Sequence, residues 1–476
     1  MADDASFPEF PRGFILSKTE VTPPAEYVAG PILDNFFVHQ LVEVDAAQSG
    51  TTYVVVLGLM VDSQQKYTGS FATRLLSTLA HGNDALFREL HWLVGRYSVI
   101  FGDETTMNIV TDATGMRSVF YAEDASVVGS HAFMVERYAA GKVKRSRLPS
   151  KFGHPGNRTP YPHTKVLTPN TFLDITHGVV HRFWPSQSPT PISVEEAATT
   201  VLAAAAQALK NLADGRLLRL ALTAGLDSRV MMAVVQRAGV DVETYTYGTR
   251  YNTSVDRNMA RDLAAKYSLK HHVVPQADTP PALSDQLNRA SYSPHHAGVV
   301  ASLRSWFGDP RTVAISGNLL EIGRVRASNH FVPNATLGIV SPDTPGQLVK
   351  LHHHRMNRKA QLLAESYGRE KWLAFSEAAF TEFMNDTDFG EATTLIDAFD
   401  LYYWEHRMGT WHGPAMNERD FYADAFIPFN ARGIFETMLG VDLEKRTARE
   451  IFYAMIRQVD EHLLDLPVNP TRWPPN

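Results

Sequence analysis

Residues 220–230 read LALTAGLDSRV, which combines an apolar run, a turn of small residues and an Asp-Ser pair. A second apolar run, Val230 to Val235, follows immediately. This pattern predicts a buried strand, a tight loop and the first turn of a helix. Because a helix N-terminus presents unpaired N–H groups and the positive end of the helix dipole, the loop is a natural place to bind an anion.

The small residues Thr223, Ala224 and Gly225 would let backbone N–H groups approach phosphate oxygens. Asp227 would repel a phosphate directly, so it fits better as a ligand of Mg²⁺, with the cation bridging carboxylate and phosphate. The residues match neither a loop ending in Gly-Lys-Ser/Thr nor the dinucleotide motif G-x-G-x-x-G. A strand followed by a glycine turn that binds no ligand is the alternative interpretation.

Strands and helices alternate around this loop. Ser193 is the predicted N-cap of a long helix, with Glu196 in the capping-box position. This alternation predicts right-handed crossovers and a parallel, doubly wound sheet, whose ligands bind beyond the carboxyl ends of the strands. The expected strands are 217–223, 242–248, 270–275 and 312–317.

The first part of the chain has a different pattern. Residues 51–135 alternate short β-rich runs with turns and predict an antiparallel sheet with one helix. Pro and Gly exclude regular structure over much of residues 151–175. Residues 182–193, rich in Pro and Ser, are typical of a linker. We therefore expect one domain over residues 1–185 and a second over 192–476.

Composition excludes several classes of function. The chain has 476 residues, which suggests two or three domains, and its net charge of -6 provides no basic surface for nucleic acid. The absence of Cys removes disulfides, thiolate catalysis and Cys-based zinc sites, and fits a cytoplasmic location. The acidic N-terminus does not resemble a signal peptide, and no apolar segment is long enough to cross a membrane. We expect no nucleic-acid or membrane partner.

Residues 223–228 resemble the pyrophosphate-binding loop Ser-Gly-Gly-x-Asp-Ser of the ATP pyrophosphatases. Thr223 replaces the Ser and Ala224 the first Gly, while Gly225, Asp227 and Ser228 match. Taken alone, this similarity is moderate. The segments that follow it extend the resemblance to one family.

The next segment, VETYTYGTRYNTSVDRNMARDLAAKYSLKHHVV, resembles the asparagine synthetase family, with Asp256 and Ala260 in its Asp-x-x-x-Ala helix. The segment AISGNLLEIGR is similar to the family's Ser-Gly-x-Gly-x-Asp-Glu, with Ser316, Gly317 and Glu321 in register when one residue is deleted. The Asp of that pattern is missing, since Leu320 precedes Glu321. Later residues resemble the family's helical region, where Asp424 stands at the position of a Glu.

The first domain resembles the glutaminase-type domain of the same family, especially in Gly95-Arg96-Tyr97 and DATGMRSVFY. The resemblance implies an α/β protein in which an Ntn-hydrolase-like antiparallel domain precedes a parallel-sheet domain of the adenine nucleotide alpha hydrolase-like type with a helical C-terminal part. Glutaminase domains use an N-terminal Cys nucleophile. Here residue 2 is Ala and the chain contains no Cys, so we expect no glutaminase activity.

The resemblance implies an ATP-dependent ligase that adenylates a small-molecule or peptide carboxylate, releases pyrophosphate and couples the product to an amine. Asp227 and Glu321 would hold Mg²⁺, and Asp424 would orient the nucleophile. ATP would contact Leu222, Thr223, Gly225, Asp227, Ser228, Tyr247, Ser316 and Gly317.

Two further interpretations stay open. Some members of the family close β-lactam rings or peptide macrocycles without ammonia, and a Cys-free first domain suits such a cyclase. Alternatively, the departures at Ala224 and Leu320 suit a non-catalytic nucleotide-binding relative. A homodimer or a biosynthetic partner protein is also compatible with the sequence.

Three other features are interpreted as structural. The His runs at 294–296 and 352–354 are expected to be solvated or hydrogen-bonded rather than metal-binding, because adjacent side chains diverge. Arg229 could bind phosphate or a substrate carboxylate, or make a structural salt bridge, and the structural role is the one expected. In the segment WEHRMGTWHG, aromatic residues would pack in the core while Glu405 and Arg407 face solvent.

Overall fold

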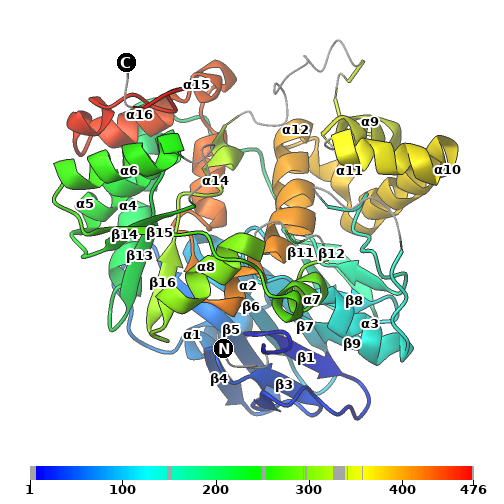
Figure 1. Ribbon diagram of the computed structural model, residues 1–476. Coiled ribbons are helices and arrows are strands. Elements are labelled where there is room, and N and C mark those ends of the chain that lie inside the picture. Colours follow the sequence, from blue (N-terminus) through cyan, green and yellow to red (C-terminus); the bar gives the residue numbers. More distant parts are fainter. Residues whose placement is uncertain are drawn as a thin grey trace.

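The computed structural model describes residues 7–146, 153–248, 254–292, 294, 297–324, 338–339, 341–355 and 358–473. Within these residues the chain forms two antiparallel sheets, A and B, and one parallel sheet, C (Figure 1). In spatial order, sheet A contains β10 (Thr164–Val166), β8 (Phe120–Ala122), β9 (Val127–Gly129), β1 (Phe14–Ser17), β3 (Phe36–His39) and β2 (Tyr27–Ala29). Sheet B contains β12 (Val179–Arg182), β11 (Thr171–Asp174), β7 (Met107–Thr111), β6 (Leu93–Gly102), β5 (Thr52–Asp62) and β4 (Val44–Ser49).

Sheets A and B pack face to face, with helices on both outer faces. Side chains alternate along each strand, so Leu57 of β5 faces sheet A while Val56 faces the helices beneath sheet B. Helices α1 (Phe71–Leu79) and α2 (Asn83–Glu89) cover that outer face, followed by η1 (Leu90–Trp92). Helix α3 (Ala132–Ala140) covers the outer face of sheet A. The first part is therefore a four-layer α-β-β-α structure.

Sheet C carries the second part. Its order is β15 (His271–Val274), β14 (Glu243–Tyr247), β13 (Leu217–Ala221), β16 (Thr312–Ile315) and β17 (Asp424–Phe426), and all pairs are parallel. The chain moves outward from β13 to β15 and returns on the other side of β13 with β16. Helices α4 (Val194–Leu212), α5 (Leu226–Ala238), α6 (Ser254–Lys266), α7 (Pro281–Ala290) and α8 (Ala297–Phe307) connect these strands or flank them (Figure 1).

The remaining helices are, in chain order, η3 (Leu320–Gly323), α9 (Pro345–Arg355), α10 (Arg358–Thr387), α11 (Phe389–Ala392), α12 (Ala398–Leu401), the π-helix η5 (Tyr402–His412), α13 (Gly413–Met416), η6 (Arg419–Phe421), α14 (Arg432–Leu439), α15 (Leu443–Thr447), α16 (Glu450–Arg457) and η7 (Glu461–Leu464). They fall into two places: α14 and α16 pack on the helices of sheet C, whereas α10, one of the yellow helices at the right of Figure 1, packs against β12 of the first part.

The structure confirms the α/β fold class, with antiparallel sheets first, a parallel sheet second and helices toward the C-terminus. Each strand expected in sheet C is present, and Ser193 caps α4 by accepting a hydrogen bond from the Glu196 N–H at 3.2 Å. The Pro- and Gly-rich segment nevertheless contains β10 and β11. No described helix has the length and apolar character needed to cross a membrane.

One expectation about polar residues of the helical part was wrong, and another is met in one of its two forms. Glu405 is fully buried rather than solvent-facing, because the Arg182 guanidinium donates to both its carboxylate oxygens, at 2.6 and 2.8 Å. His352 is also buried and packs against His406, with ring centroids 5.3 Å apart. Its Nδ1 lies 3.4 Å from the Tyr402 hydroxyl. His352 is therefore hydrogen-bonded rather than solvated, which is one of the two alternatives expected for it.

Candidate functional site

The loop between β13 and α5 lies where the strand order of sheet C reverses. Leu220 of β13 is paired with Ile315, the last residue of β16, so the two strands end side by side. Gly317 follows β16, and a Cβ atom at this position would lie 2.7 Å from the Asp227 carbonyl oxygen. The end of β16 thus lies directly against the first turn of α5. Such a reversal point is where open parallel sheets bind ligands.

The side chains of the loop hold its backbone in shape. The Thr223 N–H donates to Ser228 Oγ at 3.0 Å, and the two hydroxyls are 2.9 Å apart. The Gly225 N–H donates to Thr223 Oγ1 at 3.2 Å, while the Ala224 N–H donates to Asp256 Oδ1 at 2.9 Å. Gly225 is the N-cap of α5, and no described side chain caps this helix. The first turn of α5 therefore offers N–H donors to a ligand.

Arg229 supports the loop from within the protein. It is fully buried, and its Nη1 donates to the carbonyls of Ala224 at 2.7 Å and Gly225 at 3.0 Å. Its other nitrogens donate to the carbonyls of Leu463, Leu466 and Pro467. Burial lowers the pKa of Arg229 to about 10. The structural interpretation of Arg229 is confirmed, because its guanidinium is engaged by backbone oxygens.

Asp227 and Glu321 come together through a third residue. Arg324 Nη2 lies 2.8 Å from Asp227 Oδ2 and 3.6 Å from Glu321 Oε1. Asp227 is in the first turn of α5 and Glu321 is in η3, so the two carboxylates reach the same guanidinium from different elements. Sequence analysis missed Arg324. Its spacing of three residues from Glu321 is the only local signal, and that spacing is common in unrelated helices.

The other predicted nucleotide contacts differ in how accessible they are. Tyr247 ends β14 and is 37% exposed, so its ring is available to a ligand. Ser316 is buried, and its hydroxyl has no hydrogen-bond partner among the described residues. Leu222 is fully buried in the core; its N–H donates to the Tyr245 carbonyl and its carbonyl accepts from the Thr246 hydroxyl. Leu222 could therefore offer a nucleotide only the second lone pair of its carbonyl oxygen.

Asp424 does not join the site. Val313 of β16 is paired with both Asp424 and Leu218, so Asp424 is level with the start of β13. Leu218 lies three residues before the end of β13, which is about 10 Å along a strand, and the loop begins beyond that end. The expected role of Asp424 in orienting a nucleophile is therefore wrong for a reaction at this loop.

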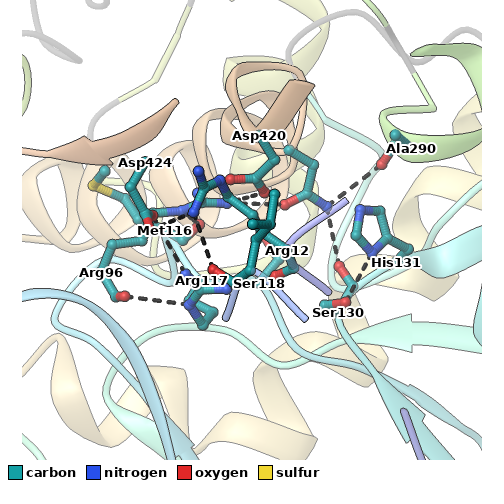
Figure 2. Close-up of polar contacts among 12 residues, drawn as sticks. Arg12, Arg96, Met116, Arg117, Ser118, Ser130, His131, Ala290, Asp420 and Asp424 are labelled. Atoms are coloured by element: carbon teal, nitrogen blue, oxygen red, sulfur yellow. Dashed lines mark hydrogen bonds and ion pairs between the residues drawn. The ribbon is translucent and has the colours of Figure 1, made fainter. Parts of the chain in front are cut away.

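Asp424 instead belongs to a buried ionic cluster between the first part and sheet C (Figure 2). Its Oδ2 accepts from Arg12 Nη1 at 2.9 Å, and Arg117 Nη2 lies 3.6 Å from Oδ1. Burial alone would raise the pKa of Asp424, but the charges of Arg12 and Arg117 outweigh it and lower the pKa. Arg96 makes a two-point contact with Asp420 in the same cluster. These side chains fasten the two parts together.

Several predicted features fall outside the described residues or gain no support. Ala2, which would be the mature N-terminus, and both histidines of segment 294–296, His295 and His296, lie outside the residues that the structure describes. In the rest of the chain, no group of three or more His, Cys, Asp or Glu side chains is placed to hold a metal ion.

Comparison with known proteins adds little to this geometry. No protein-family model and no curated protein matches the sequence. Among solved structures, glutamine phosphoribosylpyrophosphate amidotransferase from B. subtilis is 13% identical with a TM-score of 0.20; the match covers 58% of this chain and 57% of that one. NMN synthetase from Francisella tularensis is 11% identical with a TM-score of 0.20, over 59% of this chain and 100% of that one. The function must therefore be inferred from the site itself.

Proposed function

We propose that this protein is an ATP-dependent ligase that forms AMP and pyrophosphate while joining a carboxylate to an amine. The observation that supports this proposal is the loop of Thr223–Ser228 at the reversal point of sheet C, with the first turn of α5 beside two carboxylates. Backbone N–H groups bind an anion, whereas acidic side chains bind a cation. One ligand can therefore contact both only if it combines an anion with a cation. A metal–nucleotide complex meets that requirement.

The donor set suits Mg²⁺ rather than a metal held by protein ligands alone. Asp227 and Glu321 already lie close enough to share one cationic group, Arg324. Mg²⁺ is commonly held by one or two carboxylates, with phosphate oxygens and water completing its shell. We therefore assign Asp227 and Glu321 as the protein ligands. When bound, Mg²⁺ would neutralise the charge that develops on the pyrophosphate leaving group.

The chain's own groups would then position the reactants. The N–H groups at the start of α5 would donate to phosphate oxygens, and the Ser228 hydroxyl would keep the loop in the shape that this requires. The half-exposed ring of Tyr247 would contact the base, and Gly317 would let β16 approach α5. A substrate carboxylate would displace pyrophosphate from the α-phosphorus, and an amine would then displace AMP to form the amide.

An exchange assay tests this proposal. Incubation of the protein with ATP, labelled pyrophosphate and a mixture of candidate carboxylates should transfer label into ATP, with mass spectrometry identifying any amide product. Glu321→Gln should reduce the exchange rate with a smaller effect on ATP affinity, because Asp227 would still hold the metal. Nucleotide binding without exchange or AMP formation with any carboxylate would instead support a non-catalytic relative.

The position of Arg324 is one specific observation that favours the alternative of a non-catalytic nucleotide-binding protein. A guanidinium between two carboxylates is a stable ion-pair arrangement that needs no metal. A protein that had lost catalysis could keep such a pair to hold α5 and η3 together. The two interpretations differ in whether Asp227 and Glu321 bind a divalent cation at all.

A further inference from the structure

Arg324 contacts both residues that we assign to the metal, and it is well placed to influence that metal. Its side chain is 12% exposed, and its guanidinium lies 5.6 Å from the centre of the Phe452 ring on α16. Its Nε has no hydrogen-bond partner among the described residues. The guanidinium is therefore held mainly by the two carboxylates and by the aromatic ring beneath it.

A divalent cation and this guanidinium would compete for the same oxygens. The 2.8 Å contact between Arg324 Nη2 and Asp227 Oδ2 occupies an oxygen that a metal ion would need. Two positive groups at contact distance from one carboxylate also repel each other, most strongly where solvent access is limited. The guanidinium must move before a cation can take its place at Asp227 Oδ2. An incoming phosphate would offer it a new partner, since Arg binds phosphate oxygens readily.

We propose that Arg324 is an internal counter-ion that keeps divalent cations out of the nucleotide-free site and transfers to phosphate when the metal–nucleotide complex enters. This inference rests on the proposed function. Arg324 then has a positioning role, because it lets the metal ion and the nucleotide bind together as one complex and not one after the other. The same carboxylates would bind a divalent cation on their own if the guanidinium were absent.

Titration of nucleotide-free protein with Mn²⁺, followed by the electron paramagnetic resonance of the free ion, tests this inference. Arg324→Gln should bind Mn²⁺ at least tenfold more tightly than the wild type. The matched control is Arg311→Gln, because Arg311 also pairs with an aspartate, Asp309, at 2.8 Å but lies at the opposite end of β16. This control should leave Mn²⁺ affinity unchanged. Adding Asp227→Asn to Arg324→Gln should abolish the gain.

A second measurement uses the nucleotide without metal. ATP in the presence of a chelator should bind Arg324→Gln severalfold more weakly than the wild type, because the phosphate would lose its guanidinium partner. Arg324→Met, which keeps an apolar stem against Phe452, serves both measurements if the Gln variant does not fold. Equal Mn²⁺ affinity in wild type and either variant would overturn the role of Arg324. Failure of the wild type to bind ATP with Mg²⁺ would instead overturn the proposed function.

Discussion

Three strands of sheet C, β14 to β16, lie between Asp227 and Glu321 in sequence, yet a single guanidinium contacts both carboxylates. Asp227 lies in the first turn of a helix, where an acidic side chain also interacts favourably with the helix dipole. Its side chain is partly exposed, so it contributes little to the hydrophobic core. A substitution of Asp227 should therefore change the reaction without changing the stability of the fold.

We expect Asp227→Asn to abolish formation of AMP and pyrophosphate while the protein stays folded, because the amide keeps the shape of the side chain but loses the charge that would hold Mg²⁺. Product formation and circular dichroism measure the two effects. Asp84→Asn is the control, since Asp84 is an exposed aspartate in the first turn of another helix, α2. An Asp227→Asn enzyme with wild-type turnover would contradict the assignment of the loop.

The positions of single site residues were predictable from the sequence only where those residues belong to a local motif. Asp227 and the residues around it form one continuous motif, and Glu321 follows a strand directly, so both could be placed at the carboxyl edge. Arg324 and Asp424 could not be placed, because their partners are distant in sequence. The Asp424 pair with Arg12 spans 412 positions, and no local pattern encodes such a contact.

At the scale of elements, the contact between the end of β16 and the start of α5 sets the position of the loop. A Cβ atom at Gly317 would lie 2.7 Å from the Asp227 carbonyl oxygen and 2.9 Å from Met231 Cγ. The first of these atoms belongs to the backbone and cannot move without shifting α5. The absence of a side chain at residue 317 is thus a requirement of the site.

Gly317→Ala should therefore lower the free energy of unfolding by about 1–3 kcal/mol, as overpacking of a tight contact does, and should weaken ATP binding. Urea unfolding and nucleotide titration measure these effects. Gly346→Ala is the control, because a Cβ there meets no atom within 4 Å and lies in a helix, where Ala is preferred. Equal stability of the two variants would show that β16 can move away from α5.

The strands β13 to β16 of sheet C were predictable because each is a short run bounded by turns and alternates with helices. β10 and β11 were missed, since Pro and Gly dominate the surrounding sequence although each strand itself contains neither. β17 was missed for another reason. It has only three residues and lies within a helical region, so its strand character depends on pairing with β16.

At the scale of the whole molecule, three buried histidines lie where the first part meets the helical part. Burial lowers the pKa of His154 and of His406 to about 3, and burial together with the nearby His406 lowers the pKa of His352. The His406 ring lies 3.0 Å, through Nε2, from the His154 carbonyl oxygen. These imidazoles stay neutral in the folded protein, whereas in the unfolded chain they gain protons near pH 6.5.

Stability should therefore fall as the pH is lowered from 7 to 5, because the unfolded state binds the additional protons in this range. Each buried histidine should contribute a loss of about 2 kcal/mol. Urea unfolding at both pH values should show a smaller loss for His406→Gln than for the wild type. His81→Gln, which replaces an exposed histidine, should leave the loss unchanged. A loss of the same size in His406→Gln would contradict this assignment.

The first part should not hydrolyse glutamine, although its four-layer architecture is intact. The sequence contains no Cys, so the thioester intermediate of glutaminases with a Cys nucleophile cannot form. We expect turnover with an amine substrate in the absence of glutamine, and no release of glutamate from glutamine by the purified protein. Glutamate release that persists through purification and is lost on substitution of a residue in the first part would contradict this expectation.

The contacts of Arg229 with the carbonyls of Leu463, Leu466 and Pro467 also determine when the nucleotide loop can form during translation. The Asn469 N–H donates to the Ala224 carbonyl at 3.0 Å, so the hydrogen bonding of the loop is completed by residues that follow it far downstream in the sequence. During translation, sheet C can begin to form while those residues are still inside the ribosome. A nascent chain should therefore acquire affinity for nucleotide only after residues 463–469 have left the ribosome.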